Sequence, residues 1–171
     1  FVGRMARQKA PEVFVEMASR LIARGIAARF VMHGDGELAG WVDDLIRRHH
    51  LGSHIVRRDS SVPVPDTLAE AHVLVVPSHN EGLTLTTLEA IRKGVPVIST
   101  DVGAQRDLVP ARALFPRDVH RAVRVSARLV AELAADEAGR ERLWRDEYRA
   151  EQALVGQTPA GEWFSKEIAG W

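Results

Sequence analysis

The feature that most constrains this fold is a run of four apolar residues, Val73-Leu74-Val75-Val76, with no polar residue between them. A strand of this kind is covered on both faces, as in the middle of a parallel sheet. Similar apolar runs occur at residues 30–32 and 95–98, and amphipathic segments separate them. Alternating strands and helices are typical of right-handed β-α-β units. The sequence therefore predicts a Rossmann-like, doubly wound parallel sheet of about six strands, with helices on both faces.

The amphipathic segments have recognisable ends. Pro11 is well placed as the first residue of a helix, apolar side chains then recur at helical spacing, and Gly25 ends the pattern. Helices are predicted at residues 11–23, 38–50, 66–71 and 86–93, and from Val119 almost to the end with a break at 156–159. Strands are predicted at residues 1–2, 30–32, 55–56, 73–76, 95–98 and 113–115.

Composition narrows the class of protein. The 171 residues suit one domain, and we treat residues 1–171 as a single Rossmann-like unit. Lys and Arg number 23 and Asp and Glu also number 23, a balance that argues against a nucleic-acid partner. Cysteine is absent, which excludes a disulfide framework and favours a reducing, cytoplasmic location. No apolar run approaches the length that spans a bilayer, so any membrane association is expected through another part of the protein.

Ligands of such folds bind at the carboxyl ends of the strands, so the loops there are the candidate sites. The first loop contains Gly3, Arg4 and Lys9 and leads into the helix at Pro11. Two cations beside a helix N-terminus can hold a diphosphate, because Arg offers a planar fork and the helix end offers N–H groups. The alternative is two solvated basic residues in a surface loop.

Two other loops contain glycine turns. Gly34-Asp35-Gly36, with Gly40, is close to a dinucleotide fingerprint. Asp35 and Glu37 would repel a pyrophosphate there, so a tight turn that lets the backbone approach a ligand fits better. The turn at residues 101–104 is expected to be a plain connection.

The strongest pattern is Ser78-His79-Asn80-Glu81-Gly82-Leu83-Thr84, followed by a helix that carries Glu89. Backbone N–H groups after Glu81 can hold phosphate oxygens, and two carboxylates beside them can accept from sugar hydroxyls. The alternative for Glu89 is structural, because Thr86-x-x-Glu89 matches a capping box. The seven histidines show no metal-ligand spacing, so no metal site is predicted.

The order of these motifs resembles the group 1 glycosyltransferases, which have the two-domain GT-B fold. The resemblance covers about residues 1 to 135, and its specific part is Glu81 and Glu89 with seven residues between them, after Pro77-Ser78. It implies that this chain is the C-terminal, donor-binding half of a retaining enzyme that uses a nucleoside-diphosphate sugar. It implies no cofactor and no metal.

The resemblance also implies the role of individual residues. Arg4 and Lys9 would bind the donor diphosphate, Glu81 would contact the transferred sugar, and Glu89 would bind the ribose. Glu81, Arg4 and Lys9 are the catalytic candidates. The remaining donor-binding candidates are Gly3, Gly34, Arg57, Ser78, Gly82, Leu83, Thr84 and Leu85.

Some features depart from the family pattern. Relatives usually have an aromatic residue and glycine near the nucleobase, where this chain has Arg57-Arg58-Asp59, so the base is left open. The acceptor domain is expected upstream of Phe1, a helix at residues 158–171 is expected to pack on it, and the chain alone is expected to transfer no sugar. Two alternatives are kept: a non-catalytic module that binds a nucleotide sugar, and an enzyme related to the sugar-nucleotide 2-epimerases.

Overall fold

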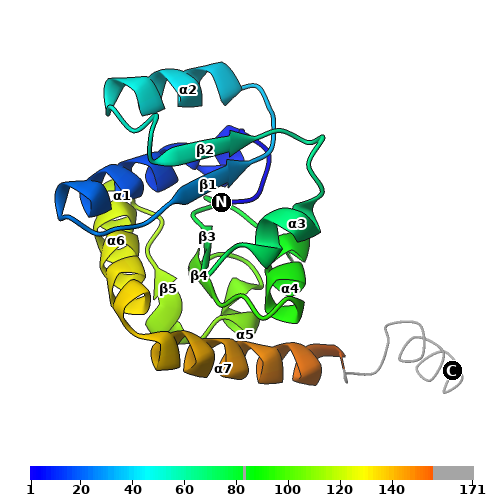
Figure 1. The fold of residues 1–171 in the computed structure, drawn as a ribbon. Helices are drawn as coiled ribbons and strands as arrows, with labels where there is room; N and C mark the ends of the chain where they lie inside the picture. Colours follow the sequence, from blue (N-terminus) through cyan, green and yellow to red (C-terminus); the bar gives the residue numbers. More distant parts are fainter. Residues whose placement is uncertain (83, 156–171) are drawn as a thin grey trace, which may run out of the picture.

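A computed structural model describes residues 1–82 and 84–155 of the chain. Strands and helices alternate along the chain, and the termini of the described part lie at the centre and at one end of the molecule (Figure 1). The strands are β1 (Phe30–His33), β2 (Ile55–Arg58), β3 (Leu74–Val76), β4 (Val97–Thr100) and β5 (Leu114–Phe115). The helices are α1 (Pro11–Ala23), α2 (Ala39–Arg48), α3 (Val64–Ala69), α4 (Leu85–Arg92), α5 (Gln105–Leu108), α6 (Val119–Ala135) and α7 (Glu137–Val155), with two 3₁₀ helices, η1 (Arg7–Lys9) and η2 (Ala111–Ala113).

All strand pairs are parallel. β1 pairs with β2, and β3, β4 and β5 form a second hydrogen-bonded group in that order. The opening residues lie beside β1: Val2 forms a parallel bridge with His33, and the His33 N–H donates to the Phe1 carbonyl at 2.9 Å. The predicted parallel α/β class is therefore confirmed, with the expected first strand reduced to a single bridge.

Helices cover both faces of these strands. α1 contacts both α2 and α6, and α1 and α6 lie together on one side of the strands in Figure 1. α3 and α4 lie on the other side, and α7 runs past the ends of α4, α5 and β4. This is the two-sided arrangement that the uninterrupted apolar strands predict.

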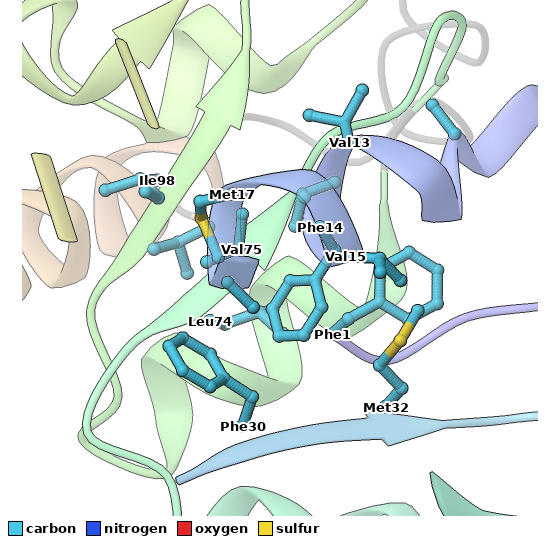
Figure 2. Packing of buried hydrophobic residues seen from close by; sticks show 14 of the residues in the cluster. Phe1, Val13, Phe14, Val15, Met17, Phe30, Met32, Leu74, Val75 and Ile98 are labelled. Atoms are coloured by element: carbon cyan, nitrogen blue, oxygen red, sulfur yellow. The ribbon is translucent and has the colours of Figure 1, made fainter. Parts of the chain in front are cut away.

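The core lies where α1 meets the strands. Figure 2 shows Val13, Phe14, Val15 and Met17 of α1 among side chains of Phe1, Phe30, Met32, Leu74, Val75 and Ile98. The ring of Phe14 lies between two others, with centroids 5.9 Å from Phe1 and 6.0 Å from Phe30. Such aromatic contacts add to the free energy gained from burying apolar area.

Several predicted boundaries were wrong. β4 begins at Val97 rather than at residue 95, because Pro96 has no N–H and contributes only its carbonyl, which accepts from Leu74. β2 continues through Arg58, so Arg57 lies in a strand and not in the loop after it.

The long C-terminal helix is interrupted at Asp136, whose carboxylate accepts from the N–H of Gly139. The short elements η1 and α5 were not predicted, and the expected break at 156–159 and tail at 158–171 lie outside the described residues.

Within residues 1–82 and 84–155, no helix has the length and hydropathy needed to cross a membrane.

Candidate functional site

Parallel pairing places the carboxyl ends of β1 and β2 together and those of β3, β4 and β5 together. Contacts between the loops that follow join these two groups, and we call the place where the loops meet the carboxyl edge. The loops that follow the opening segment, β1, β3 and β4 meet there. Hydrogen bonds and close packing join each of them to at least one other. The sequence-predicted loops therefore form one cluster.

Lys9 and Glu81 form the centre of this cluster. Lys9 lies in η1 and Glu81 follows β3, 72 residues further along the chain, and the Lys9 Nζ donates to Glu81 Oε1 at 2.6 Å. The side chain of Glu81 is 6% exposed and that of Lys9 is 24% exposed. A carboxylate this deeply buried needs a partner to offset its desolvation, and Lys9 supplies it.

Gln8, which precedes Lys9, joins the two loops through its backbone and its side chain. The N–H of His79 donates to the Gln8 carbonyl at 2.8 Å, and Gln8 Nε2 donates to the Asn80 carbonyl at 2.8 Å. The sequence did not single out Gln8, because a glutamine in a surface loop gives no signal of a partner 72 residues away. Gln8 fixes the register between the two loops and therefore the position of Lys9 beside Glu81.

The turn after β4 supports the Glu81 loop from the other side. Gly103 has φ +52°, and a Cβ there would lie 1.8 Å from the Glu81 carbonyl oxygen. Thr100 Oγ1 donates to the Ser78 carbonyl at 2.5 Å. The expectation that residues 101–104 form a plain connection was therefore wrong: only glycine allows this turn to approach the backbone at Glu81 so closely.

Glycines also bring the β1 loop against the first loop. Gly34 has φ +124°, and a Cβ there would lie 2.2 Å from the Gly3 carbonyl oxygen. Gly36 has φ +153°, and its Cβ would meet the Met5 carbonyl at 2.5 Å. The backbone approach expected of this turn is thus an approach to the chain's own first loop.

The side chains around this contact are engaged in different ways. Asp35 accepts from the N–H of Ser60 at 2.9 Å and from its hydroxyl at 2.8 Å, and these hydrogen bonds hold the pKa of Asp35 below its usual range. Arg57 donates to Asp43 Oδ1 at 3.0 Å and to the carbonyls of Met32 and Gly34 at 3.2 and 3.3 Å. Arg4 is exposed on the first loop. Arg57 therefore joins β2 to α2, whereas the exposed Arg4 is presented to solvent.

The segment from Ser78 to Glu89 mixes buried and exposed groups. Ser78 is 1% exposed, and among the described residues its Oγ has no hydrogen-bond partner. Gly82 and Leu85 are exposed, Thr84 is buried, and Leu83 lies outside the described residues. Glu89 is exposed on α4.

The start of α4 decides between the two interpretations of Thr86. The helix begins at Leu85 with Thr84 at the N-cap position, so Thr86 lies within the first turn. A capping box requires the Ser or Thr at the N-cap itself. The capping-box alternative for Thr86 and Glu89 was therefore wrong.

In the part of the chain that the structure describes, no three His, Cys, Asp or Glu side chains converge in a way that could hold a metal ion. Lys9 and Arg4 supply positive charge at this edge, and Arg7 is a further exposed arginine of the same loop.

Comparison with known proteins relates the chain to a family. The family described as Glycosyl transferases group 1 matches residues 1–134. A D-inositol 3-phosphate glycosyltransferase of Geodermatophilus obscurus is 36% identical over 120 residues, which are 64% of this chain and 27% of that protein. An alpha-D-kanosaminyltransferase of Streptomyces kanamyceticus is 29% identical over 111 residues, 64% of this chain and 29% of that protein. The chain thus spans less than a third of the length of these relatives.

Solved structures with the same fold include isolated domains. The C-terminal domain of a group 1 family glycosyl transferase from Francisella tularensis matches with a TM-score of 0.76 at 20% identity, over 91% of this chain and 84% of that one. The pneumococcal O-GlcNAc transferase GtfA, solved in complex with UDP and GlcNAc, matches with a TM-score of 0.73 at 20% identity, over 89% of this chain and 31% of that one. At these identities the likeness concerns the fold.

Proposed function

Because the chain belongs to the group 1 glycosyltransferases, we propose that it is the donor-binding half of a retaining glycosyltransferase. The enzyme transfers a sugar from a nucleoside-diphosphate sugar to an acceptor. The observation that carries the proposal is the 2.6 Å pair of Lys9 and Glu81, which joins two family motifs at the carboxyl edge. A solved protein of the same fold was captured with UDP and GlcNAc, which supports a nucleotide-sugar ligand.

Lys9 and Arg4 bind the donor diphosphate. An ammonium group has three N–H donors, and Glu81 occupies one of those of Lys9. Lys9 can therefore keep its contact with Glu81 while it donates to a phosphate oxygen. Arg4 is exposed at the same edge, where its planar fork suits a second phosphate oxygen. Together they stabilise the negative charge that grows on the diphosphate as it leaves.

Glu81 contacts the transferred sugar, and the backbone at residues 83–85 holds a phosphate at the start of α4. A helix N-terminus offers N–H groups and a favourable dipole to an anion. Glu89, exposed one turn further along α4, binds the ribose hydroxyls. Gly3, Gly34, Ser78 and Gly82 shape the loops around the donor, and Arg57 positions β2 beneath it.

No metal or cofactor takes part in this proposal, because Lys9, Arg4 and the helix N-terminus supply the neutralising charge. The acceptor site belongs to an N-terminal domain of the same protein, since relatives are more than three times as long as the matched segment. The chain alone then transfers no sugar, and transfer by the purified 171-residue chain would contradict this part of the proposal. A cytoplasmic location is also part of the proposal, supported by the cysteine-free composition.

Calorimetry of the purified chain with UDP, GDP and ADP, each with and without EDTA, tests the proposal. We expect weak binding of at least one nucleotide that is unchanged by the chelator. Binding that disappears with EDTA would refute the metal-free site, and no binding of any of the three would refute the donor site itself.

A further inference from the structure

Thr84 occupies the N-cap position of α4, but its side chain does not cap the helix. Threonine is a favoured N-cap residue because its hydroxyl can accept from the N–H two or three positions further on. None of the described N–H groups of the first turn of α4 donates to the Thr84 hydroxyl. That hydroxyl instead accepts from Nε2 of Gln105, the first residue of α5.

Gln105 is held in place for this contact. It is 1% exposed, and its carboxamide lies between two threonines of α4, with Nε2 also 3.2 Å from Thr87 Oγ1. Its backbone N–H donates to the Val102 carbonyl at 3.1 Å, and its own carbonyl accepts from Val109 at 2.7 Å. A buried amide is costly unless its hydrogen bonds are made, so these contacts keep the side chain in one orientation.

The turn that carries Gln105 is itself fixed against the candidate site. Gly103, two residues earlier, packs on the Glu81 carbonyl in a conformation that a Cβ would prevent. The Gln105 carboxamide is therefore set at a defined distance from the start of α4. Its reach to Thr84 follows from the same packing that places Glu81.

Capping by Thr84 and binding of an anion compete for the same N–H groups. If the Thr84 hydroxyl accepted from the first turn of α4, it would occupy a donor that a phosphate oxygen needs. The Thr87 N–H already donates to the Thr84 carbonyl at 3.0 Å, so the hydroxyl and a phosphate would compete for the Thr86 N–H. We infer that Gln105 is a positioning residue of the donor site: it holds the Thr84 hydroxyl away from the start of α4 and so leaves the Thr86 N–H to the donor diphosphate. The ligand in this inference rests on the proposed function.

Substitution of Gln105 tests the inference. Gln105→Met keeps most of the volume but releases the Thr84 hydroxyl, which can then cap α4. We expect the affinity for the nucleotides UDP, GDP and ADP to fall about tenfold, the scale of one hydrogen bond to a charged group. The double variant Gln105→Met/Thr84→Val has no hydroxyl left to cap the helix, and we expect it to regain nucleotide affinity to within about twofold of the wild type.

Thr87→Val is the matched control, because it also removes a partner of Gln105 but from a position inside the helix. We expect its nucleotide affinity to stay within about twofold of the wild type. A role in stability alone predicts a different pattern: the double variant would bind no better than Gln105→Met. That result would overturn the inference.

Hydrogen exchange gives a measurement that needs no ligand. In Gln105→Met the amide of Thr86 should exchange more slowly than in the wild type, because the Thr84 hydroxyl can now accept from it, and the double variant should reverse this. Unchanged exchange in Gln105→Met would overturn the inference even if nucleotides bind. Absence of nucleotide binding by the wild type, with the exchange pattern as expected, would instead count against the proposed function.

Discussion

Two buried carboxyl groups, one beyond the carboxyl end of β3 and one beside the start of β4, behave differently. Glu81 follows β3 at the carboxyl edge and has a cation, Lys9, at 2.6 Å. Glu147, on α7, is 0% exposed and lies beside the start of β4, where both of its oxygens accept from the N–H of Val97, at 3.2 and 3.0 Å. Burial raises the pKa of Glu147 to about 9, so it is neutral near pH 7.

The difference shows that burial of an acid is not in itself a sign of a binding site. Glu147 joins α7 to β4 as a neutral hydrogen-bonding group, and nearby Trp144 Nε1 donates to the Ile91 carbonyl at 2.7 Å. Glu81 has a cation from a distant loop, and its loop also carries the exposed Gly82. The partner and the place in the sheet distinguish a candidate for chemistry from a structural contact.

The largest expected effect concerns Glu147 and pH. Its pKa in the folded chain, about 9, lies above its ordinary value of 4.5, so the folded state binds the proton more tightly. The stability that this provides is complete below about pH 4.5 and is lost as pH rises towards about 9. From pH 5 to pH 8 this one group lowers the free energy of unfolding by about 4 kcal/mol.

Denaturant unfolding of the wild type and Glu147→Gln across that pH range measures the effect. Glutamine keeps an acceptor for the Val97 N–H but has no proton to lose, so its stability should vary less with pH. Equal pH dependence in the two proteins would show that Glu147 is ionised in the folded state and would remove the contrast with Glu81.

The second effect concerns the pair at the carboxyl edge. Lys9→Met leaves the Glu81 carboxylate buried without its cation, and we expect the free energy of unfolding to fall by about 3 kcal/mol. Lys9→Met/Glu81→Gln has no unpaired charge and should recover most of this loss, as measured by denaturant unfolding.

Arg92→Met is the control for this pair at the other side of the sheet. Arg92 pairs with buried Glu151, but the Arg92 side chain is 58% exposed and Gln152 also donates to Glu151 at 2.7 Å. We expect a smaller loss than for Lys9→Met, because Gln152 still donates to the buried Glu151 carboxylate after Arg92 is removed. An equal loss in Lys9→Met and Arg92→Met would mean that the Lys9 pair is an ordinary structural one.

The sequence predicted the strands and the site loops for the same physical reason. A β-branched apolar run such as residues 74–76 is typical of a strand covered on both faces, and parallel strands bring their carboxyl ends to one edge. Once the fold class was known, the loops with Lys9 and Glu81 were therefore expected at the same edge. The sequence alone predicts this shared edge, and the structure adds the contact between the two side chains.

The positions of several buried polar residues could not be predicted, because they depend on contacts between residues far apart in the sequence. Gln105 looks like a surface residue in the sequence, and only the packing of α5 on α4 makes it a buried partner of Thr84. Arg57 was assigned to a loop because Ile55 and Val56 form the apolar part of β2, whereas the strand continues through pairing of Arg57 with Met32. Glu147 resembles any exposed glutamate of a charged helix. Hydrophobic periodicity does not predict polar residues that are buried between two helices or between a helix and a strand.

The smallest effect separates the two glutamates of the carboxyl edge, and it concerns nucleotide affinity. Glu89, if it binds ribose hydroxyls, serves a nucleotide and a nucleotide sugar alike, so Glu89→Gln should weaken nucleotide binding by about 1–3 kcal/mol. Glu81 contacts the sugar, so Glu81→Gln should leave nucleotide affinity nearly unchanged. Calorimetry with UDP, GDP and ADP measures both.

Trp144→Phe is the control from the opposite side of the sheet. It loses the hydrogen bond to Ile91, so the melting temperature should fall by an amount that corresponds to about 1 kcal/mol, with nucleotide affinity unchanged. Because α4 begins at Leu85, a capping role cannot explain an effect of Glu89→Gln on nucleotide affinity. Unchanged affinity in Glu89→Gln would therefore refute the ribose contact, and equal losses in the two glutamate variants would refute the division of roles between them.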